Sequence, residues 1–151
     1  VAVALKDRLQ RSHEAILLHS SCQEISRNFD TLSIARPFEA PALDYGAEVG
    51  VKLDASVNRG NKSLGFRGMQ RVEHFARWAS QRSERTIIVG GHSLWFRSFF
   101  QVFLPKASEH ICKKKKIVNC GAVAFTLHST KQQRFRIDPD SITVVYGGFS
   151  K

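Results

Sequence analysis

Cysteine is scarce in this chain of 151 residues, and long apolar segments are absent. The three cysteines, Cys22, Cys112 and Cys120, include no Cys-x-x-Cys pair and are odd in number. A disulfide framework is therefore not expected, and a reducing compartment, the cytoplasm, is the predicted location. No apolar run approaches the roughly 18 residues of a membrane span, and no charged-then-apolar leader opens the chain, so no membrane attachment is expected.

Metal-binding patterns are missing as well. His110, Cys112 and Cys120 lie near one another in the sequence, but their spacing fits no common zinc motif. We therefore predict neither a metal nor a cofactor.

Acidic residues are few, because 13 Asp and Glu stand against 23 Lys and Arg and leave a net charge of +10 at pH 7. Such a surface favours anionic partners: phosphorylated metabolites, acidic proteins, nucleic acid or anionic lipid. The only charge run, Lys113 to Lys116, is short for membrane attachment and has no interleaved aromatic side chains. A solvated turn is the favoured interpretation, and a basic module that binds anions or nucleic acid is kept as an alternative.

Apolar periodicity predicts the helices. Within residues 65–81 apolar side chains recur every three or four positions, which indicates one buried stripe. Residues 94–104 form a strongly apolar helix that Pro105 ends. A shorter helix is expected over residues 6–12, after a strand end at residues 1–5. The predicted stripe consists of Met69, Val72, Phe75, Ala76 and Ala79.

Short apolar runs predict strands between these helices, and Thr86 to Val89 has the β-branched character of a strand buried on both faces. Strands alternating with helices indicate one layered α/β domain over residues 1–151 with a largely parallel sheet. Residues 36–63, with Pro37 and Pro41, are predicted to be a long irregular lid or pocket wall. The further strands are expected at residues 15–18, 116–127 with an interruption at Gly121, 135–137 and 142–146.

The apolar run 86–89 is followed by Gly90-Gly91-His92-Ser93, which fits two chemistries. In one, Ser93 is the nucleophile of a serine hydrolase, because Gly-His-Ser-Leu-Trp nearly spells Gly-x-Ser-x-Gly. Trp95 occupies the place of the final glycine, however, and the order of acid and histidine after Ser93 fits poorly. The serine hydrolase is therefore kept only as an alternative.

In the other chemistry His92 is the functional residue, at the carboxyl edge of the sheet where open α/β folds bind ligands. A helix that begins near Ser93 offers unpaired N–H groups and a partial positive charge, which suit a phosphate. Gly90 and Gly91 let a ligand approach the backbone closely, and Ser93 is then expected to be the N-cap.

The segment IIVGGHSLWFRSFFQVFLP, followed by KKKKIVNCGAVAF, resembles the C-terminal half of the histidine phosphatase superfamily, the phosphoglycerate-mutase-like proteins. It is most similar to a small eukaryotic-type branch whose second catalytic histidine sits in a Gly-His-Ser turn. Cys22-Gln23-Glu24-Ile25 is similar to the segment around the acidic proton donor, with Glu24 at the acid position. Asn58-Arg59-Gly60-Asn61-Lys62 and Tyr146-Gly147-Gly148-Phe149 also look like that branch, so the resemblance covers nearly the whole chain.

The resemblance implies a three-layer α/β/α fold with a mostly parallel central sheet, and phosphomonoester hydrolysis or mutase chemistry through a phosphohistidine. In such proteins one histidine attacks phosphorus, while two arginines and a second histidine hold the phosphoryl oxygens. A carboxylic acid protonates the leaving oxygen. His92 corresponds to the second histidine, with Ser93 beside it at the phosphate, and Glu24 corresponds to the acid. A phosphorylated small molecule or a phosphoprotein is the implied partner.

The family's nucleophile normally sits in an Arg-His-Gly motif at the end of the first strand, and this chain contains no Arg-His-Gly. Val3 to Arg11 keeps the Leu and Gln of the next family signature, with Asp7 at its arginine position and Arg8 one place later. Arg8 is either a phosphate ligand or a solvated helix arginine. We expect a partial domain without its first strand, or a relative without the nucleophile, with marginal stability and little or no phosphatase activity.

Three basic residues of the irregular segment are candidates for substrate selection. Arg36, Arg59 and Lys62 are predicted to meet a second anionic group of the substrate. This hypothesis rests on their charge and on the expectation that residues 36–63 line the pocket.

Overall fold

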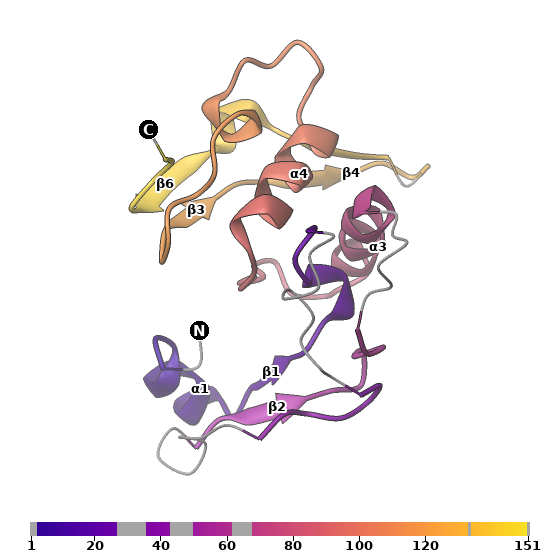
Figure 1. The fold of residues 1–151 in the computed structure, drawn as a ribbon, viewed down its shortest axis with the longest axis vertical. Helices are drawn as coiled ribbons and strands as arrows, with labels where there is room; N and C mark the ends of the chain where they lie inside the picture. Colours follow the sequence, from indigo (N-terminus) through magenta and orange to yellow (C-terminus); the bar gives the residue numbers. More distant parts are fainter. Residues whose placement is uncertain (1–2, 27–35, 43–49, 62–67, 133, 151) are drawn as a thin grey trace. The chain divides into compact units, whose positions relative to one another are not determined.

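The computed structural model describes residues 3–26, 36–42, 50–61, 68–132 and 134–150 (Figure 1). The chain divides into two compact units. The first consists of Val1–Ser20 with Arg27–Phe66, and the second of Ser21–Ser26 with Arg67–Lys151. The described residues form helices and small sheets, which confirms a mixed α/β protein, whereas a single domain over residues 1–151 stays a prediction.

The first unit contains one helix and one parallel strand pair. Helix α1 covers Lys6–Ser12 and ends where His13 takes a left-handed conformation, with φ of 55°. Strand β1 (Ala15–Leu17) pairs in parallel with β2 (Lys52–Asp54), so that Ile16 lies opposite Leu53. The predicted helix over residues 6–12 and the strand after it are confirmed, and β2 lies inside the segment predicted to be irregular.

A buried asparagine connects the loops of the first unit. Asn58 is 5% exposed, and its side-chain nitrogen donates to the backbone carbonyls of Arg36 and Glu39 at 3.1 and 2.9 Å. Its side-chain oxygen accepts from Ser20 Oγ at 3.1 Å and from the Gly60 N–H at 3.0 Å. Because both donors and both acceptor sites of the amide are used, Asn58 joins three separate stretches of sequence.

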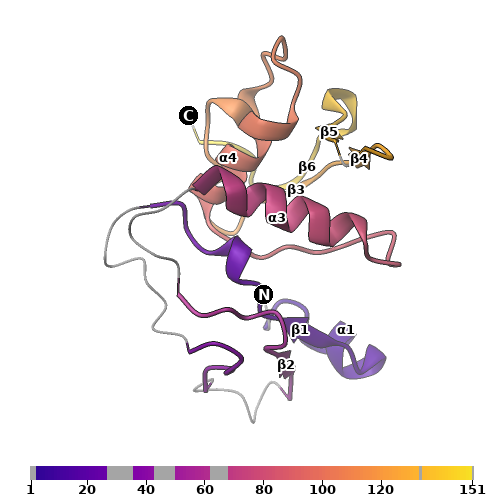
Figure 2. The same ribbon diagram turned by 90° about the vertical axis from the view of Figure 1, so that its right-hand side faces the viewer.

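The second unit is built on two helices that lie side by side, α3 (Gly68–Ser80) and α4 (Ser93–Phe103) (Figures 1 and 2). Two antiparallel strand pairs complete it, β3 with β6 and β4 with β5. Short 3-10 turns occur at η1 (Ser20–Cys22, which begins at the last residue of the first unit), η3 (Ile111–Lys113) and η4 (Pro139–Ser141). The four strands are β3 (Ala122–Ala124), β4 (Leu127–Ser129), β5 (Phe135–Ile137) and β6 (Thr143–Tyr146).

An aromatic cluster forms the core of the second unit. Trp95 stacks on Phe99 with ring centroids 5.1 Å apart, and Phe75 of α3 meets both rings edge-on at 5.3 and 6.1 Å. Phe103 continues the cluster 4.7 Å from Phe99. Residues 95, 99 and 103 share one face of α4 because they are spaced four apart, so one helical stripe supplies much of the core.

The two predicted helices of the second unit are confirmed within a few residues of their ends. Of the predicted stripe on α3, Val72, Phe75 and Ala76 are buried, whereas Met69 at the first turn is 50% exposed. The helix predicted over residues 94–104 is α4, which ends before Pro105 because proline cannot continue the hydrogen-bond ladder.

The strand predicted over Thr86 to Val89 is wrong. These residues form no strand, and Ile87 and Ile88 are 36% and 58% exposed, although the pattern predicted burial on both faces. Among the described residues no strand pairs with them. A β-branched run becomes a strand only where a neighbour pairs its backbone N–H and C=O groups, and no local pattern specifies that neighbour.

The strand predicted over residues 116–127 is divided into an isolated bridge between Ile117 and Phe149, followed by β3. The predicted interruption at Gly121 has a steric cause. A Cβ at this position would lie 2.7 Å from Ile117 Cγ2 and 2.9 Å from the Val118 carbonyl oxygen. Glycine is therefore required where the chain turns into β3.

The sheets are smaller than the sequence predicted. In the described part of the chain three two-stranded sheets occur, and only β1–β2 is parallel. The β4–β5 pair joins neighbouring segments through residues 130–134, a connection short enough only for antiparallel strands. A large parallel central sheet is not among these elements.

Replacing Phe99 with Ala is expected to lower the free energy of unfolding by about 3–5 kcal/mol, because the ring is 2% exposed and contacts aromatic side chains on several sides. Met69→Ala is the matched control from the predicted stripe of α3, with an expected change within about 0.5 kcal/mol. Denaturant titration followed by tryptophan fluorescence measures both. Equal losses in the two variants would contradict the core described above.

Candidate functional site

His92 lies at the N-terminus of α4. It is the N-cap residue, with φ of −104° and ψ of 148°, and Ser93 is the first helical residue. The prediction that Ser93 is the N-cap is therefore wrong by one position. The ladder of α4 begins with the Phe96 N–H donating to the His92 carbonyl at 3.1 Å, and in the described structure no side chain caps this end. The first N–H groups of α4 thus form a partially positive end without a side-chain partner.

Glu24 lies beside His92. Its Oε2 is 3.9 Å from His92 Nδ1, and the Glu24 side chain is 12% exposed whereas that of His92 is 58% exposed. At this separation a protonated imidazole and a carboxylate attract each other without a direct hydrogen bond. The other carboxylate oxygen, Oε1, accepts from the Ile25 N–H at 2.6 Å. The structure therefore brings together the two residues that the family resemblance assigned to catalysis.

Two side chains hold the segment that carries Glu24. The Trp95 Nε1–H donates to the Ser21 carbonyl at 2.6 Å, and Arg71 Nη2 donates to the Glu24 carbonyl at 2.8 Å. Cys22 and Ile25 of the same segment pack against the aromatic core. Residues 21–26 are thus attached to both α3 and α4, which sets the position of Glu24 at the end of α4.

Arg71 is a site residue that the sequence did not predict. Burial lowers the pKa of its guanidinium, and electrostatic interaction with Cys22 and Glu24 opposes this shift. Arginine nevertheless stays charged at neutral pH, so Arg71 adds a positive charge next to Glu24. The helical pattern placed its neighbour Val72 in the core but carried no signal that Arg71 meets a residue 47 positions earlier.

The partly buried Cys22 and the buried Cys112 are poor nucleophiles. Burial raises the pKa of the Cys22 thiol to about 12, although the charge of Arg71 acts in the opposite direction. Burial also raises the pKa of Cys112, to about 11. Both groups are therefore thiols at neutral pH, whereas nucleophilic attack requires the thiolate. Within the described ranges no group of three or more His, Cys, Asp or Glu residues is arranged to hold a metal ion.

Ser93 lacks the surroundings of a catalytic serine. A nucleophilic hydroxyl needs a base within hydrogen-bond reach, and among the described residues no hydrogen bond joins Ser93 to a histidine. Trp95 fills the position where the elbow needs glycine, and it is 1% exposed. The serine hydrolase alternative therefore gains no support from the geometry.

Arg8, the predicted phosphate ligand, lies on α1 in the first unit. Its Nε is 3.6 Å from Glu14 Oε2, and both side chains are more than half exposed, at 62% and 54%. An exposed pair of this kind contributes little to stability. The guanidinium is thus solvated and paired with a neighbouring carboxylate.

Two of the three predicted specificity residues also belong to the first unit. Arg36 Nη1 is 3.9 Å from Glu39 Oε1, and the Arg59 guanidinium lies 4.7 Å from the centroid of the Phe38 ring. Asn58 connects the loops that carry these arginines, as described above. Lys62 lies outside the described residues.

Half of the lysine run stabilises the turn after α4. Lys113 Nζ donates to three backbone carbonyls of residues 105–108, at 3.1, 3.1 and 3.0 Å. Lys114 pairs with the Glu109 carboxylate. Lys113 and Lys114 therefore stabilise the turn, which leaves Lys115 and Lys116 as the exposed remainder of the run.

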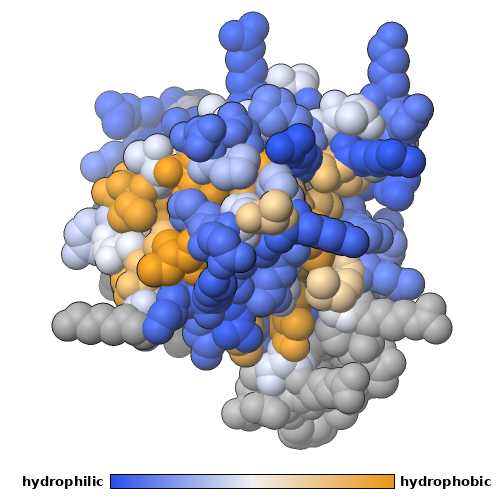
Figure 3. All heavy atoms as spheres, turned by 90° about the horizontal axis from the view of Figure 1, so that it is seen from above, coloured by the Kyte–Doolittle hydropathy of each residue, from blue (hydrophilic) through white to orange (hydrophobic). Residues whose placement is uncertain are grey.

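Hydrophilic side chains cover most of the face of the molecule seen in Figure 3, with smaller apolar areas between them.

Comparison of the chain with models of protein families, with curated proteins and with solved structures gave no match. In the part of the chain that the structure describes, no helix has the length and apolar character needed to cross a membrane. The functional assignment therefore rests on the chain's own residues and their geometry.

At about pH 8.5, where an ordinary thiol is half ionised, iodoacetamide is expected to modify the exposed Cys120 and to leave Cys22 and Cys112 unmodified. The raised pKa values and the burial of the latter two explain the difference. Peptide mass spectrometry measures the extent of modification at each site. A Cys120→Ser variant should take up label only after denaturation, and labelling of native Cys22 at the rate of Cys120 would contradict the structure.

Proposed function

We propose that the second unit carries the phosphate-binding and proton-donating part of a phosphoryl-transfer site that resembles those of histidine phosphatases. The observation that carries the proposal is the 3.9 Å approach of His92 Nδ1 to Glu24 Oε2 at the N-terminus of α4. In this proposal His92 binds the phosphoryl oxygens and Glu24 protonates the leaving oxygen of a phosphomonoester. The reaction is hydrolysis or mutase-type transfer through a phosphohistidine.

The N-terminal end of α4 has groups that suit the binding of an oxyanion. An imidazole N–H of His92 and the free N–H groups at the first turn are hydrogen-bond donors, and the helix dipole adds partial positive charge. Such fixed donors stabilise the charge that spreads over a transferring phosphoryl group. Ser93, at the first helical position, lies beside the oxyanion in this arrangement. The net charge of +10 favours the approach of an anionic substrate.

The carboxyl group of Glu24 is held in a fixed position. Its side chain is largely buried, and the hydrogen bond from the Ile25 N–H to Oε1 holds the carboxyl group in one orientation. Arg71 acts as a positioning residue in this proposal, because it binds the backbone carbonyl of Glu24. General acid catalysis requires this kind of fixed approach between the acid and the leaving oxygen.

The chain by itself is proposed to be inactive or weakly active, because it contains no Arg-His-Gly nucleophile motif. The proposed architecture of an active assembly is a phosphoglycerate-mutase-like, three-layer fold. In such an assembly the nucleophilic histidine comes from sequence other than these 151 residues. A phosphorylated small molecule or a phosphoprotein is the proposed substrate class, and Arg36, Arg59 and Lys62 are the proposed selectivity residues.

Inorganic phosphate is expected to shift the His92 side-chain resonances saturably in nitrogen-detected NMR spectra, with a dissociation constant on the order of 1 mM, typical of weak binding. His92→Ala should abolish saturable binding, measured independently by calorimetry. His74→Ala, an exposed histidine on α3, is the matched control and should bind phosphate as the unaltered chain does. Unchanged phosphate affinity in His92→Ala would refute the assignment.

The chain is further expected not to hydrolyse p-nitrophenyl phosphate measurably. Turnover that His92→Ala abolishes would refute the proposed inactivity while leaving the phosphate site in place.

A fluorophosphonate probe should leave Ser93 unlabelled, and stoichiometric labelling at Ser93 would favour the serine hydrolase instead.

A further inference from the structure

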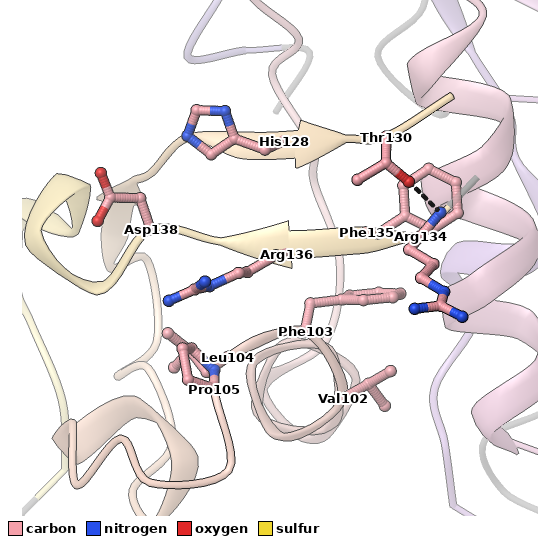
Figure 4. Close-up of a pocket in the computed structure, with 10 residues that line it drawn as sticks. All are labelled: Val102, Phe103, Leu104, Pro105, His128, Thr130, Arg134, Phe135, Arg136 and Asp138. Carbon is pink, nitrogen blue, oxygen red and sulfur yellow. Dashed lines mark hydrogen bonds between the residues drawn. The ribbon is translucent and has the colours of Figure 1, made fainter. Parts of the chain in front are cut away.

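A cavity of about 700 Å³ lies within the second unit, between the C-terminal end of α4 and the β4–β5 hairpin (Figure 4). Its volume is within the range of small-molecule sites. Its apolar wall comes from the last turn of α4 and from β5. Phe103 and Leu104 are 5% and 4% exposed, and the Phe103 ring meets Phe135 edge-on with centroids 5.9 Å apart. Phe103 and Leu104 therefore present little surface themselves, and the partly exposed Phe135 supplies the aromatic surface of the cavity.

Two arginines supply the charge of this cavity. Arg136 belongs to β5 and Arg134 immediately precedes this strand, so their side chains, two positions apart, lie on the same face of the hairpin. In Figure 4 both extend from the hairpin on the side of α4, the Arg136 guanidinium near Leu104 and that of Arg134 beyond the Phe103 ring. Both residues are exposed, and among the described residues neither forms an ion pair with a carboxylate.

The other polar residues that line the cavity do not form ion pairs with Arg134 or Arg136. Thr130 accepts from the Arg134 N–H at 3.2 Å, which fixes the turn end of the hairpin, and His128 lies opposite Arg136 in the strand register. Asp138 is the one acidic residue of the lining, and its Oδ1 already accepts from the Asp140 N–H at 3.1 Å, as the cap of η4. The lining therefore combines two guanidinium groups, one engaged carboxylate and aromatic rings.

We propose that this cavity binds a small aromatic anion. The aromatic body packs against the partly exposed side chains of Phe135 and Val102. A sulfonate, carboxylate or phosphate group receives hydrogen bonds from Arg134 and Arg136, whose planar guanidinium groups match such oxyanions. The site is separate from the pair of His92 and Glu24, and the inference does not depend on the proposed function. It fits a ligand that carries both charge and an apolar ring, because each is matched by a different part of the lining.

The test uses the full chain and 8-anilinonaphthalene-1-sulfonate, an aromatic sulfonate that becomes fluorescent in apolar surroundings. We expect saturable binding of one probe molecule per chain. The double variant Arg134→Gln/Arg136→Gln should weaken binding about 10-fold or more, because two charge-assisted hydrogen-bond donors are lost. The uncharged analogue N-phenyl-1-naphthylamine should bind the double variant and the unaltered chain equally well.

Lys115→Gln/Lys116→Gln is the matched control, since it removes the same charge from exposed positions outside the cavity. It should leave the affinity for the sulfonate unchanged. An equal loss in this control, or unchanged affinity in the arginine double variant, would overturn the proposal. Thermal unfolding is measured for both variants, and their midpoints are expected to match because all four substituted side chains are exposed.

Val102→Trp provides an independent test, because the larger side chain fills the space beside Phe103 (Figure 4). Both probes should then lose affinity, while a cooperative thermal unfolding transition like that of the unaltered chain reports that the variant is folded. Undiminished binding of both probes to a folded Val102→Trp variant would place the probe site elsewhere and overturn the proposal.

Discussion

The indole of Trp95 is the contact on which the geometry of the second unit depends. Its ring is buried between Phe75 and Phe99, and its N–H donates to the Ser21 carbonyl. A buried indole N–H needs an acceptor, and this one is supplied by a backbone segment far away in sequence. The same bond that satisfies the core therefore attaches residues 21–26 to α4 and brings Glu24 to His92. Core packing and the candidate site are consequences of one arrangement.

Helix α4 links the two proposed anion sites. His92 marks its N-terminus, where free N–H groups and the helix dipole favour a compact oxyanion, and Phe103 and Leu104 mark its other end, where aromatic surface and arginines favour a larger anion. Eleven residues at about 1.5 Å each give α4 a length of roughly 16 Å, so one small ligand does not occupy both ends. Part of the excess of basic residues is structural, as the hydrogen bond from Lys113 Nζ to the Pro105 carbonyl shows.

Local patterns predicted those parts of the molecule that depend on local interactions. The helices near residues 68–80 and 93–103 follow from apolar spacing and from Pro105, and the interruption at Gly121 follows from the properties of glycine. Thr86 to Val89 shows the limit, because its β-branched residues favour a strand that no described segment pairs with. Arg71 shows a second limit of prediction from local patterns. Helical periodicity indicates which side of α3 is buried but not which distant carbonyl an arginine binds.

The sequence by itself determined the residue types available at the candidate site, with a histidine at the start of an apolar helix, an acidic residue at position 24 and no Arg-His-Gly nucleophile. Only the tertiary structure decided that His92 and Glu24 lie 3.9 Å apart, that Arg71 binds the Glu24 carbonyl, and that Arg134 and Arg136 border the same cavity. The physical reason is that helix formation and chain turns are governed by neighbours within a few residues. Contacts between residues tens of positions apart depend instead on how the buried aromatic rings of α3 and α4 pack together.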